Sequence, residues 1–270
     1  MSSGSAVCHS ATAATAHASS VAIPMAARVA VISDVHANLA ALEAVLAAVD
    51  AEGVDELGCL GDTVGYGPRP NECCARVRDA AAVCLVGNHD LVALGAAGVD
   101  VAEFNPEAAA AARWTAHALD DDARGFLAGL EPAARREGVA LFHASARDPV
   151  WEYVLTSEAA EASFALTRES LLLVGHSHVA LALALDGARV TGGLAPDGTR
   201  LALDGPRLLL NPGSVGQPRD GDPRAAWLLL DLRRRFAAFR RVEYSVSETQ
   251  RELRERGLPE SLAARLALGH

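Results

Sequence analysis

Residues 28–36 read RVAVISDVH, a short apolar run that ends in two potential metal ligands, Asp34 and His36. The run over 28–33 is typical of a buried strand, and a helical spacing of leucine and valine follows over 38–51. Because residues two apart on an extended or turning segment share a face, both side chains can reach one ion. Taken alone, however, an Asp-x-His sequence is more often an ordinary turn than a metal site.

The same arrangement, an apolar run followed by polar residues, recurs along the chain. Runs at 57–60, 82–86, 139–142 and 171–174 precede further candidates, which are Asp62, Asn88 and His89, His143, and His176 and His178. Helices are expected over 71–80, through much of 90–131, and over 157–168. This alternation of strands and helices predicts an α/β layered fold with a mostly parallel sheet at this end.

The last third of the chain has a different pattern. Six further strand candidates cover 179–185, 189–191, 200–203, 207–210, 226–232 and 236–242, and Asp-Gly pairs at 186, 197 and 204 supply hairpin turns. These strands predict an antiparallel second sheet, and 247–268 predicts one or two amphipathic surface helices. The whole body, residues 27–270, is predicted to be one domain, a two-sheet sandwich flanked by helices.

Composition excludes several functions. The 270 residues carry a formal charge of -10, and all 24 basic residues are arginine. A chain without lysine has neither a phosphate-binding Gly-Lys-Ser/Thr loop nor a Schiff-base lysine. Because an acidic chain lacks the basic footprint that nucleic acids require, no stable nucleic-acid binding is expected. Cys59 and Cys84 lie inside apolar runs, which favours buried, reduced thiols.

The first 26 residues are rich in serine, alanine and threonine. They lack a basic leading region and a compact apolar core, so we expect a disordered tail rather than a signal peptide. No apolar run approaches the roughly 20 residues that span a bilayer. A soluble cytoplasmic protein without membrane contact is therefore expected.

Four of the five polar clusters also have a purely structural interpretation. Asp62 could be an ordinary turn residue, Asn88 a helix N-cap, and His143 a hydrogen-bonded strand-end residue. His176 and His178 are harder to explain in this way, because burying two imidazoles without partners is costly. Five of the nine histidines fall in these clusters, and their common position after apolar runs makes one two-metal site the economical explanation.

The ordered set Asp-x-His, Gly-Asp, Gly-Asn-His-Asp, His and Gly-His-x-His resembles the calcineurin-like metallophosphoesterase superfamily. Residues 61–68 (GDTVGYGP), 70–72 (PNE) and 211–217 (NPGSVGQ) further resemble a branch of small prokaryotic phosphoesterases. The resemblance covers about residues 28–243. It implies an α/β fold in the form of a four-layer α/β/β/α sandwich, with two mixed β-sheets flanked by helices.

The resemblance also implies the site and its chemistry. One divalent metal would be held by Asp34, His36, Asp62 and His178, and a second by Asp62, Asn88, His143 and His176. A metal-bridging hydroxide would then hydrolyse a phosphomonoester or phosphodiester, nucleotides among them. Asp62, Asn88 and His89 are the expected catalytic residues, with His89 at the phosphoryl group. Mixed oxygen and nitrogen ligands favour manganese or iron, while nickel, cobalt and zinc remain open.

Substrate contacts and competing functions are less constrained. Asn38, Tyr66, Arg69 and Arg219 lie on loops near the expected metal face and are candidates for binding a small phosphoester. The oligomeric state is left open. Two other classes of function also stay open: a non-catalytic binding module with this fold, and a metal hydrolase acting on a non-phosphate bond. The His-x-His-x-Asp-His and His-Glu-x-x-His motifs of such hydrolases are absent.

Overall fold

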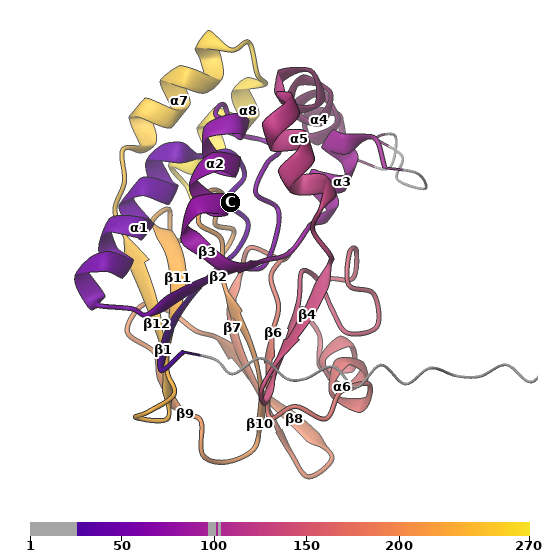
Figure 1. Ribbon diagram of the computed structural model, residues 1–270, viewed down its shortest axis with the longest axis vertical. Helices are drawn as coiled ribbons and strands as arrows, with labels where there is room; N and C mark the ends of the chain where they lie inside the picture. Colours follow the sequence, from indigo (N-terminus) through magenta and orange to yellow (C-terminus); the bar gives the residue numbers. More distant parts are fainter. Residues whose placement is uncertain (1–25, 97–100, 102–103) are drawn as a thin grey trace, which may run out of the picture.

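Two six-stranded sheets pack face to face in the computed structural model, which describes residues 26–96, 101 and 104–270 (Figure 1). The first sheet has the strand order β3-β2-β1-β11-β12-β9. Its strands are β1 (Arg28–Ile32), β2 (Glu56–Cys59), β3 (Ala81–Cys84), β9 (Arg200–Ala202), β11 (Ala225–Asp231) and β12 (Phe236–Val242). Strands β1, β2 and β3 are parallel, while β11 pairs antiparallel to β1 and the remaining pairs are antiparallel.

The second sheet has the order β4-β5-β6-β10-β7-β8. Its strands are β4 (Ala133–Arg136), β5 (Val139–Phe142), β6 (Leu171–Leu173), β7 (Ala180–Asp186), β8 (Arg189–Leu194) and β10 (Arg207–Pro212). Strands β5, β6 and β10 run parallel, and the outer pairs are antiparallel. Both sheets are therefore mixed.

Three apolar layers hold the sandwich together, because successive strand residues point to opposite faces. Val31, Leu228, Leu141 and Leu173 fill the space between the sheets. Ile32 and its neighbours face outward and pack against α1 (Leu39–Glu52) and α2 (Pro70–Ala80). The outer face of the second sheet packs against α6 (Ser157–Ala165). The predicted four layers, α/β/β/α, are confirmed.

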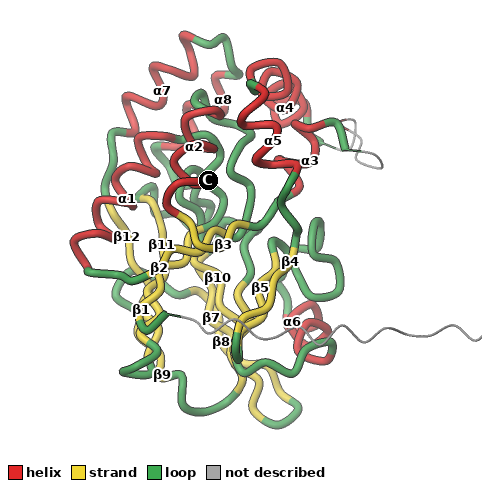
Figure 2. The backbone as a smooth tube through the Cα atoms, in the orientation of Figure 1, coloured by secondary structure: helices red, strands yellow, loops and turns green. Residues whose placement is uncertain are grey.

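The remaining helices gather beyond the carboxyl ends of the parallel strands, with loops between them and the sheets (Figures 1 and 2). They are α3 (Asn88–Leu94), α4 (Pro106–Ala118), α5 (Asp121–Ala128), α7 (Val246–Glu255) and α8 (Glu260–Leu266). Helix α8 packs against α7, and both share an apolar cluster with Tyr66 and α4. This helical layer covers the end of the sandwich where the polar clusters lie.

The assignment of the late strands to a separate antiparallel sheet was wrong. Strands β9, β11 and β12 extend the first sheet, whereas β7, β8 and β10 join the second. Local alternation identifies a strand but carries no information about its partner, which long-range packing of the two inner faces decides. Strand β4 was also missed, because its sequence AARR has no β-branched or aromatic residue.

Other expectations concern the thiols, the tail and the membrane. Cys59 is buried and free, as expected, and so are Cys73 and Cys74, whereas Cys84 is free but only partly buried. The predicted disordered tail lies outside the described residues except for Ala26. Within the described part of the chain, no helix has the length and apolarity needed to cross a membrane.

Candidate metal centre

Five strand ends deliver the polar clusters to one place. Asp34 follows β1, Asp62 follows β2, Asn88 follows β3, His143 follows β5 and His176 follows β6. The carboxyl ends of parallel strands are where open α/β sheets form ligand sites. Backbone hydrogen bonds join these loops within each sheet, including Asp34 N to Gly61 O at 3.0 Å and Gly175 N to His143 O at 2.8 Å.

The backbone is unusual at the residues that were singled out from the sequence. Among the described residues, eight other than glycine have positive φ, and five of these are Asp34, His36, Asp62, His176 and His178. Left-handed backbone costs such residues roughly 1–2 kcal/mol each and persists only where the surroundings impose it. Concentrated at these five positions, it aims their side chains at a common centre.

Two overlapping groups of ligand atoms result. Asp34, His36, Asp62 and His178 form the first group, and Asp62, His143 and His176 form the second, with each group's ligand atoms within 4.8 Å of one another. All are buried, and Asp62 belongs to both. Asn88 adjoins the second group, because its Oδ1 lies 3.1 Å from His143 Nε2. The structure thus brings together all seven predicted ligands.

Hydrogen bonds to backbone carbonyls orient His36 and His178. The Nδ1 of His36 lies 3.0 Å from Val64 O, and that of His178 lies 2.7 Å from Gln217 O. Because a carbonyl only accepts, each Nδ1 must carry the proton, which leaves each Nε2 of a neutral ring with a lone pair. These two Nε2 atoms face each other at 3.0 Å, a contact that needs a cation or an extra proton.

Backbone carbonyls also orient His143 and His176, but the two rings use different nitrogens for this contact. His143 Nδ1 lies 2.9 Å from Leu60 O, so its Nε2 is the free donor atom. His176 instead places Nε2 3.0 Å from Trp151 O, so Nδ1 is its free atom. Histidines that ligate metals usually anchor their other nitrogen in this way. All four rings are therefore held in tautomers that suit coordination.

In both Asp34 and Asp62, one carboxylate oxygen accepts a backbone hydrogen bond and the other faces the metal centre. One oxygen of each accepts a backbone N–H, from His176 to Asp34 Oδ2 at 3.1 Å and from His89 to Asp62 Oδ1 at 2.8 Å. The other oxygens, Asp34 Oδ1 and Asp62 Oδ2, are buried and have no hydrogen-bond partner among the residues that the structure describes. An unpaired buried oxygen is costly unless a cation meets it. The donor set therefore fits divalent metal.

The electrostatics of the centre favour the same occupant. Burial raises the pKa of Asp34 to about 7 and raises the pKa of Asp62 well above its usual range, where nearby Asp90 and Asp34 add to the effect. Burial lowers the pKa of His143 to about 3 and that of His176 to about 4. Neutral imidazoles beside carboxyls that resist ionisation are stabilised as ligands by a positive ion.

His89 and Asp90 have separate tasks. Asp90 accepts the backbone N–H groups of Val64 and Gly87, at 2.9 and 3.0 Å, and so caps the start of α3. His89 Nδ1 is buried and has no hydrogen-bond partner in residues 26–96, 101 and 104–270, and the ring lines the cavity beside the metal ligands.

Comparison with known proteins identifies the family. Residues 27–235 match the model of the calcineurin-like phosphoesterase superfamily domain. The chain belongs to this superfamily. It is 36% identical over 246 residues to the uncharacterized protein MJ0912 of Methanocaldococcus jannaschii, covering 89% of this chain and 98% of that one. The sequence-based resemblance is thereby confirmed.

Solved structures agree with this assignment. The crystal structure of a metallophosphoesterase from Sphaerobacter thermophilus has 42% sequence identity and a TM-score of 0.82, over 90% of this chain and 99% of that chain. The hypothetical protein PH1004 from Pyrococcus horikoshii OT3 shares the fold, with 21% identity and a TM-score of 0.73 over 90% of this chain and 98% of that one. This member of the superfamily therefore spans nearly the full length of both.

A cavity of about 360 Å³ opens beside the metal ligands in this superfamily member. Its lining includes Asn88, His89 and His176, together with the substrate candidates Tyr66 and Arg219. The two other candidates have different contacts. Asn38 caps α1 and donates to Gly216 O at 2.9 Å. The guanidinium of Arg69 pairs with Glu72 and Glu252 and does not line the cavity.

Sequence reasoning missed much of the cavity wall. Phe104, Trp151, Tyr153 and Arg265 all line it. Three of them stand on loops without any motif, and Arg265 lies on α8, 46 residues beyond Arg219 in the chain. Their approach depends on how the loops and the C-terminal helix fold back over the strand ends, which no local pattern encodes.

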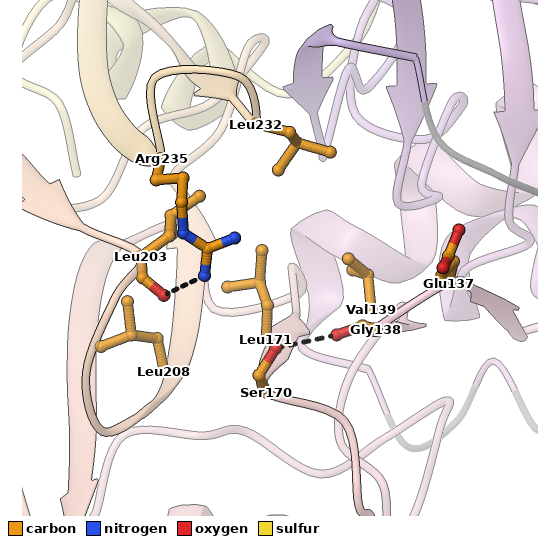
Figure 3. A pocket seen from close by; sticks show the side chains of 9 residues that line it. All are labelled: Glu137, Gly138, Val139, Ser170, Leu171, Leu203, Leu208, Leu232 and Arg235. Carbon is orange, nitrogen blue, oxygen red and sulfur yellow. Dashed lines mark hydrogen bonds between the residues drawn. The ribbon is translucent and has the colours of Figure 1, made fainter.

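A second cavity, of about 270 Å³, has different chemistry (Figure 3). Leu171, Leu203, Leu208 and Leu232 line it, and its polar groups make ordinary contacts such as Ser170 Oγ to Gly138 O at 3.3 Å. Its arginine, Arg235, pairs with Asp204 outside the lining. None of the lining residues belongs to the metal-ligand groups, so this cavity is separate from the candidate metal centre.

Proposed function

We propose that the protein is a phosphoester hydrolase that uses two divalent metal ions. The first ion would bind Asp34, His36, Asp62 and His178, and the second Asp62, Asn88, His143 and His176. The observation that carries this proposal is the pair of His36 and His178 Nε2 atoms at 3.0 Å, beside the partnerless Asp62 Oδ2. Lone pairs crowded in this way fit a bound cation better than any purely structural role.

Bound metal would lower the pKa of a water molecule and neutralise charge on the phosphoryl oxygens. The protein supplies the rest of the chemistry. His89 and Asn88 line the cavity beside the ligands, where they can donate hydrogen bonds to a phosphoryl oxygen. Burial, followed by the neighbouring His36, lowers the pKa of His89 well below its usual range. Without substrate the neutral ring is therefore favoured, and its N–H can still donate a hydrogen bond.

Whether His89 also gives a proton to the departing oxygen depends on the leaving group. An anionic phosphate beside the ring favours its protonated form, and poor leaving groups need that proton most. If His89 serves this role, His89→Asn slows an alkyl phosphate more than p-nitrophenyl phosphate. Equal slowing of both would assign His89 to phosphoryl binding alone.

The expected metal is manganese or iron. Carboxylate, amide and imidazole ligands together suit Mn²⁺, Fe²⁺, Co²⁺, Ni²⁺ or Zn²⁺ better than Mg²⁺, which prefers oxygen ligands and retained water. We propose Mn²⁺ or Fe²⁺ in the cell, acting on small phosphoesters.

The test is a phosphoester panel, including p-nitrophenyl phosphate and bis(p-nitrophenyl) phosphate, with Mn²⁺-loaded protein. Asp62→Ala and His176→Ala should each abolish metal-dependent turnover. His117→Ala is the matched control, since this exposed histidine of α4 bonds only Arg113 O of its own helix. Unchanged turnover in either ligand variant contradicts the proposal. Metal binding without turnover on any ester would instead indicate a non-catalytic binding module.

A further inference from the structure

Two arginines meet at the cavity without an acidic partner. Arg219 follows β10 on a loop, and Arg265 lies on α8. Both point to the same oxygen, Gln217 Oε1, at 2.9 Å from Arg219 and 3.5 Å from Arg265. Among the described residues, neither guanidinium has a carboxylate oxygen within 4.0 Å. Many other arginines of the protein do form ion pairs with Asp or Glu.

Holding two cations together in this way is unfavourable by itself. Within the described part of the chain, Arg219 Nε is buried without a hydrogen-bond partner, and Arg219 Nη2 contacts the Tyr66 hydroxyl, 3.3 Å away, and Gln217. Burial, and then the charge of Arg219, lowers the pKa of Arg265. Like charges that share a site without a counter-ion are expected where an anionic ligand supplies it.

The two arginines share the cavity with the reaction centre. Arg219 and Arg265 line the same 360 Å³ cavity as Asn88, His89 and His176. The scissile phosphoryl group already has Asn88, His89 and, on the proposed function, two metal ions to balance its charge. Two guanidinium groups add more positive charge than the scissile phosphoryl group needs for charge balance.

The rest of the cavity lining is aromatic. Phe104, Trp151 and Tyr153 line it. The ring centroids of Phe104 and Trp151 lie 6.0 Å apart, and the Tyr153 ring stacks on the His176 ring with 4.0 Å between centroids. Tyr153 is 47% exposed, so its ring is accessible to a ligand. Aromatic faces of this kind accept a planar organic group.

We propose that the substrate is an aromatic or heteroaromatic phosphoester with a second phosphate group, which Arg219 and Arg265 bind. This inference rests on the proposed function and names its substrate class. A phosphate carries a charge of about −1.5 to −2 at pH 7 and can balance both guanidinium groups, whereas one carboxylate would balance only one. Arg265 is then a substrate-binding residue that sets specificity and takes no part in bond cleavage.

The test compares substrates that differ by one phosphate. Mn²⁺-loaded protein is assayed with AMP and with adenosine 3′,5′-bisphosphate. Hydrolysis of p-nitrophenyl phosphate in the same preparation reports the phosphatase reaction itself. The bisphosphate should exceed AMP in kcat/KM by about tenfold or more, through a lower KM. Arg265→Gln should reduce that ratio by about tenfold, and Arg265→Lys by less, because a charge is retained. Arg251→Gln is the control, since Arg251 is exposed on α7 and pairs only with Glu255.

A ratio near one in the native protein overturns the inference. So does an equal loss of kcat/KM on both nucleotides in Arg265→Gln, since the arginine would then serve the scissile phosphate or the fold. Calorimetric binding of both nucleotides to EDTA-dialysed protein provides a readout independent of turnover, and the bisphosphate should bind more tightly there in an Arg265-dependent way. Absence of hydrolysis of both p-nitrophenyl phosphate and bis(p-nitrophenyl) phosphate would refute the proposed function, whereas hydrolysis without bisphosphate preference refutes only this inference.

Discussion

The Nε2 atoms of His36 and His178 face each other at 3.0 Å, while each ring donates its Nδ1 proton to a backbone carbonyl. The carbonyls of Val64 and Gln217 thereby fix both lone pairs toward the partnerless oxygens of Asp34 and Asp62. Metal binding removes this electrostatic conflict, so it must contribute to the stability of the folded protein.

Mn²⁺ should therefore raise the melting temperature. At a free concentration of 100 times Kd, binding to the folded state alone contributes about 2.7 kcal/mol per site. For a domain of this size, each kcal/mol corresponds to roughly 2–4 °C. Differential scanning calorimetry should show an increase of several degrees in the native protein and a much smaller one in Asp62→Ala. Equal increases in both would contradict a role for Asp62 in binding.

Asp62→Asn should separate stability from function. The amide keeps the acceptor for His89 N and presents an N–H toward His143 Nε2, which lies 3.5 Å from Asp62 Oδ2. Burial raises the pKa of Asp62, so the folded protein favours the protonated carboxyl. The contribution of Asp62 to the stability of the native protein is therefore present at low pH and is lost as pH rises through the raised pKa. The metal-free variant should be more stable than the native protein by about 1 kcal/mol or more at pH 9, and by less at pH 5.

Denaturant melts at the two pH values measure this difference. The amide of the Asp62→Asn variant cannot bridge two ions as a carboxylate does, so turnover should fall to background. A variant that is less stable at pH 9 in the absence of metal would show that the buried carboxylate is not under the strain inferred from its surroundings.

Metal binding should release protons in a pH-dependent way. The pKa of Asp34 is raised from 3.8 to about 7 by burial, so this group is still protonated in metal-free protein at pH 6. The pKa of His143 is lowered to about 3, so that ring has no proton to release. Titration calorimetry in buffers of different ionisation enthalpy should detect more proton release at pH 6 than at pH 8.5. The same release at both values would contradict the raised carboxyl pKa.

Gly87 should be required for metal affinity. A Cβ at this position would lie 2.1 Å from Asp62 Oδ1 and 2.6 Å from Asp62 N. Gly87→Ala must therefore displace Asp62, and we expect Mn²⁺ affinity to fall by about 10–100-fold, as when a group that supports a ligand is lost. The matched control is Gly125→Ala in α5, where nothing lies within 4 Å, and which should stabilise the helix by roughly 0.5–1 kcal/mol. Equal Mn²⁺ affinity in both variants would contradict this steric account.

The sequence predicted the metal ligands well for a physical reason. A buried strand is visible as an apolar run, and parallel strands end at a common edge, so polar residues after such runs converge. Asp34, Asp62, Asn88, His143 and His176 all occupy that position. The left-handed backbone that aims several of these side chains was not predicted. Aspartate and histidine adopt it more often than most residues do, but still too rarely for their presence in a sequence to indicate it.

Long-range features were less predictable. The sheet that β11 joins is decided by pairing between residues about 200 positions apart, such as Ala30 and Leu229. Arg69 looked like a substrate residue because it stands on a loop near Tyr66, yet Glu252 of α7 pairs with it. Conversely, Arg265 carried no sequence signal and reaches the cavity only through the packing of α8.

The central claim is that one carboxylate-imidazole centre holds two metal ions and hydrolyses phosphoesters. Its most direct test is turnover of bis(p-nitrophenyl) phosphate by EDTA-dialysed protein, measured against equivalents of Mn²⁺ added per chain. Activity should be absent without metal, remain low up to one equivalent and reach its plateau at two. Turnover in the absence of metal, or a plateau at one equivalent, would contradict the account.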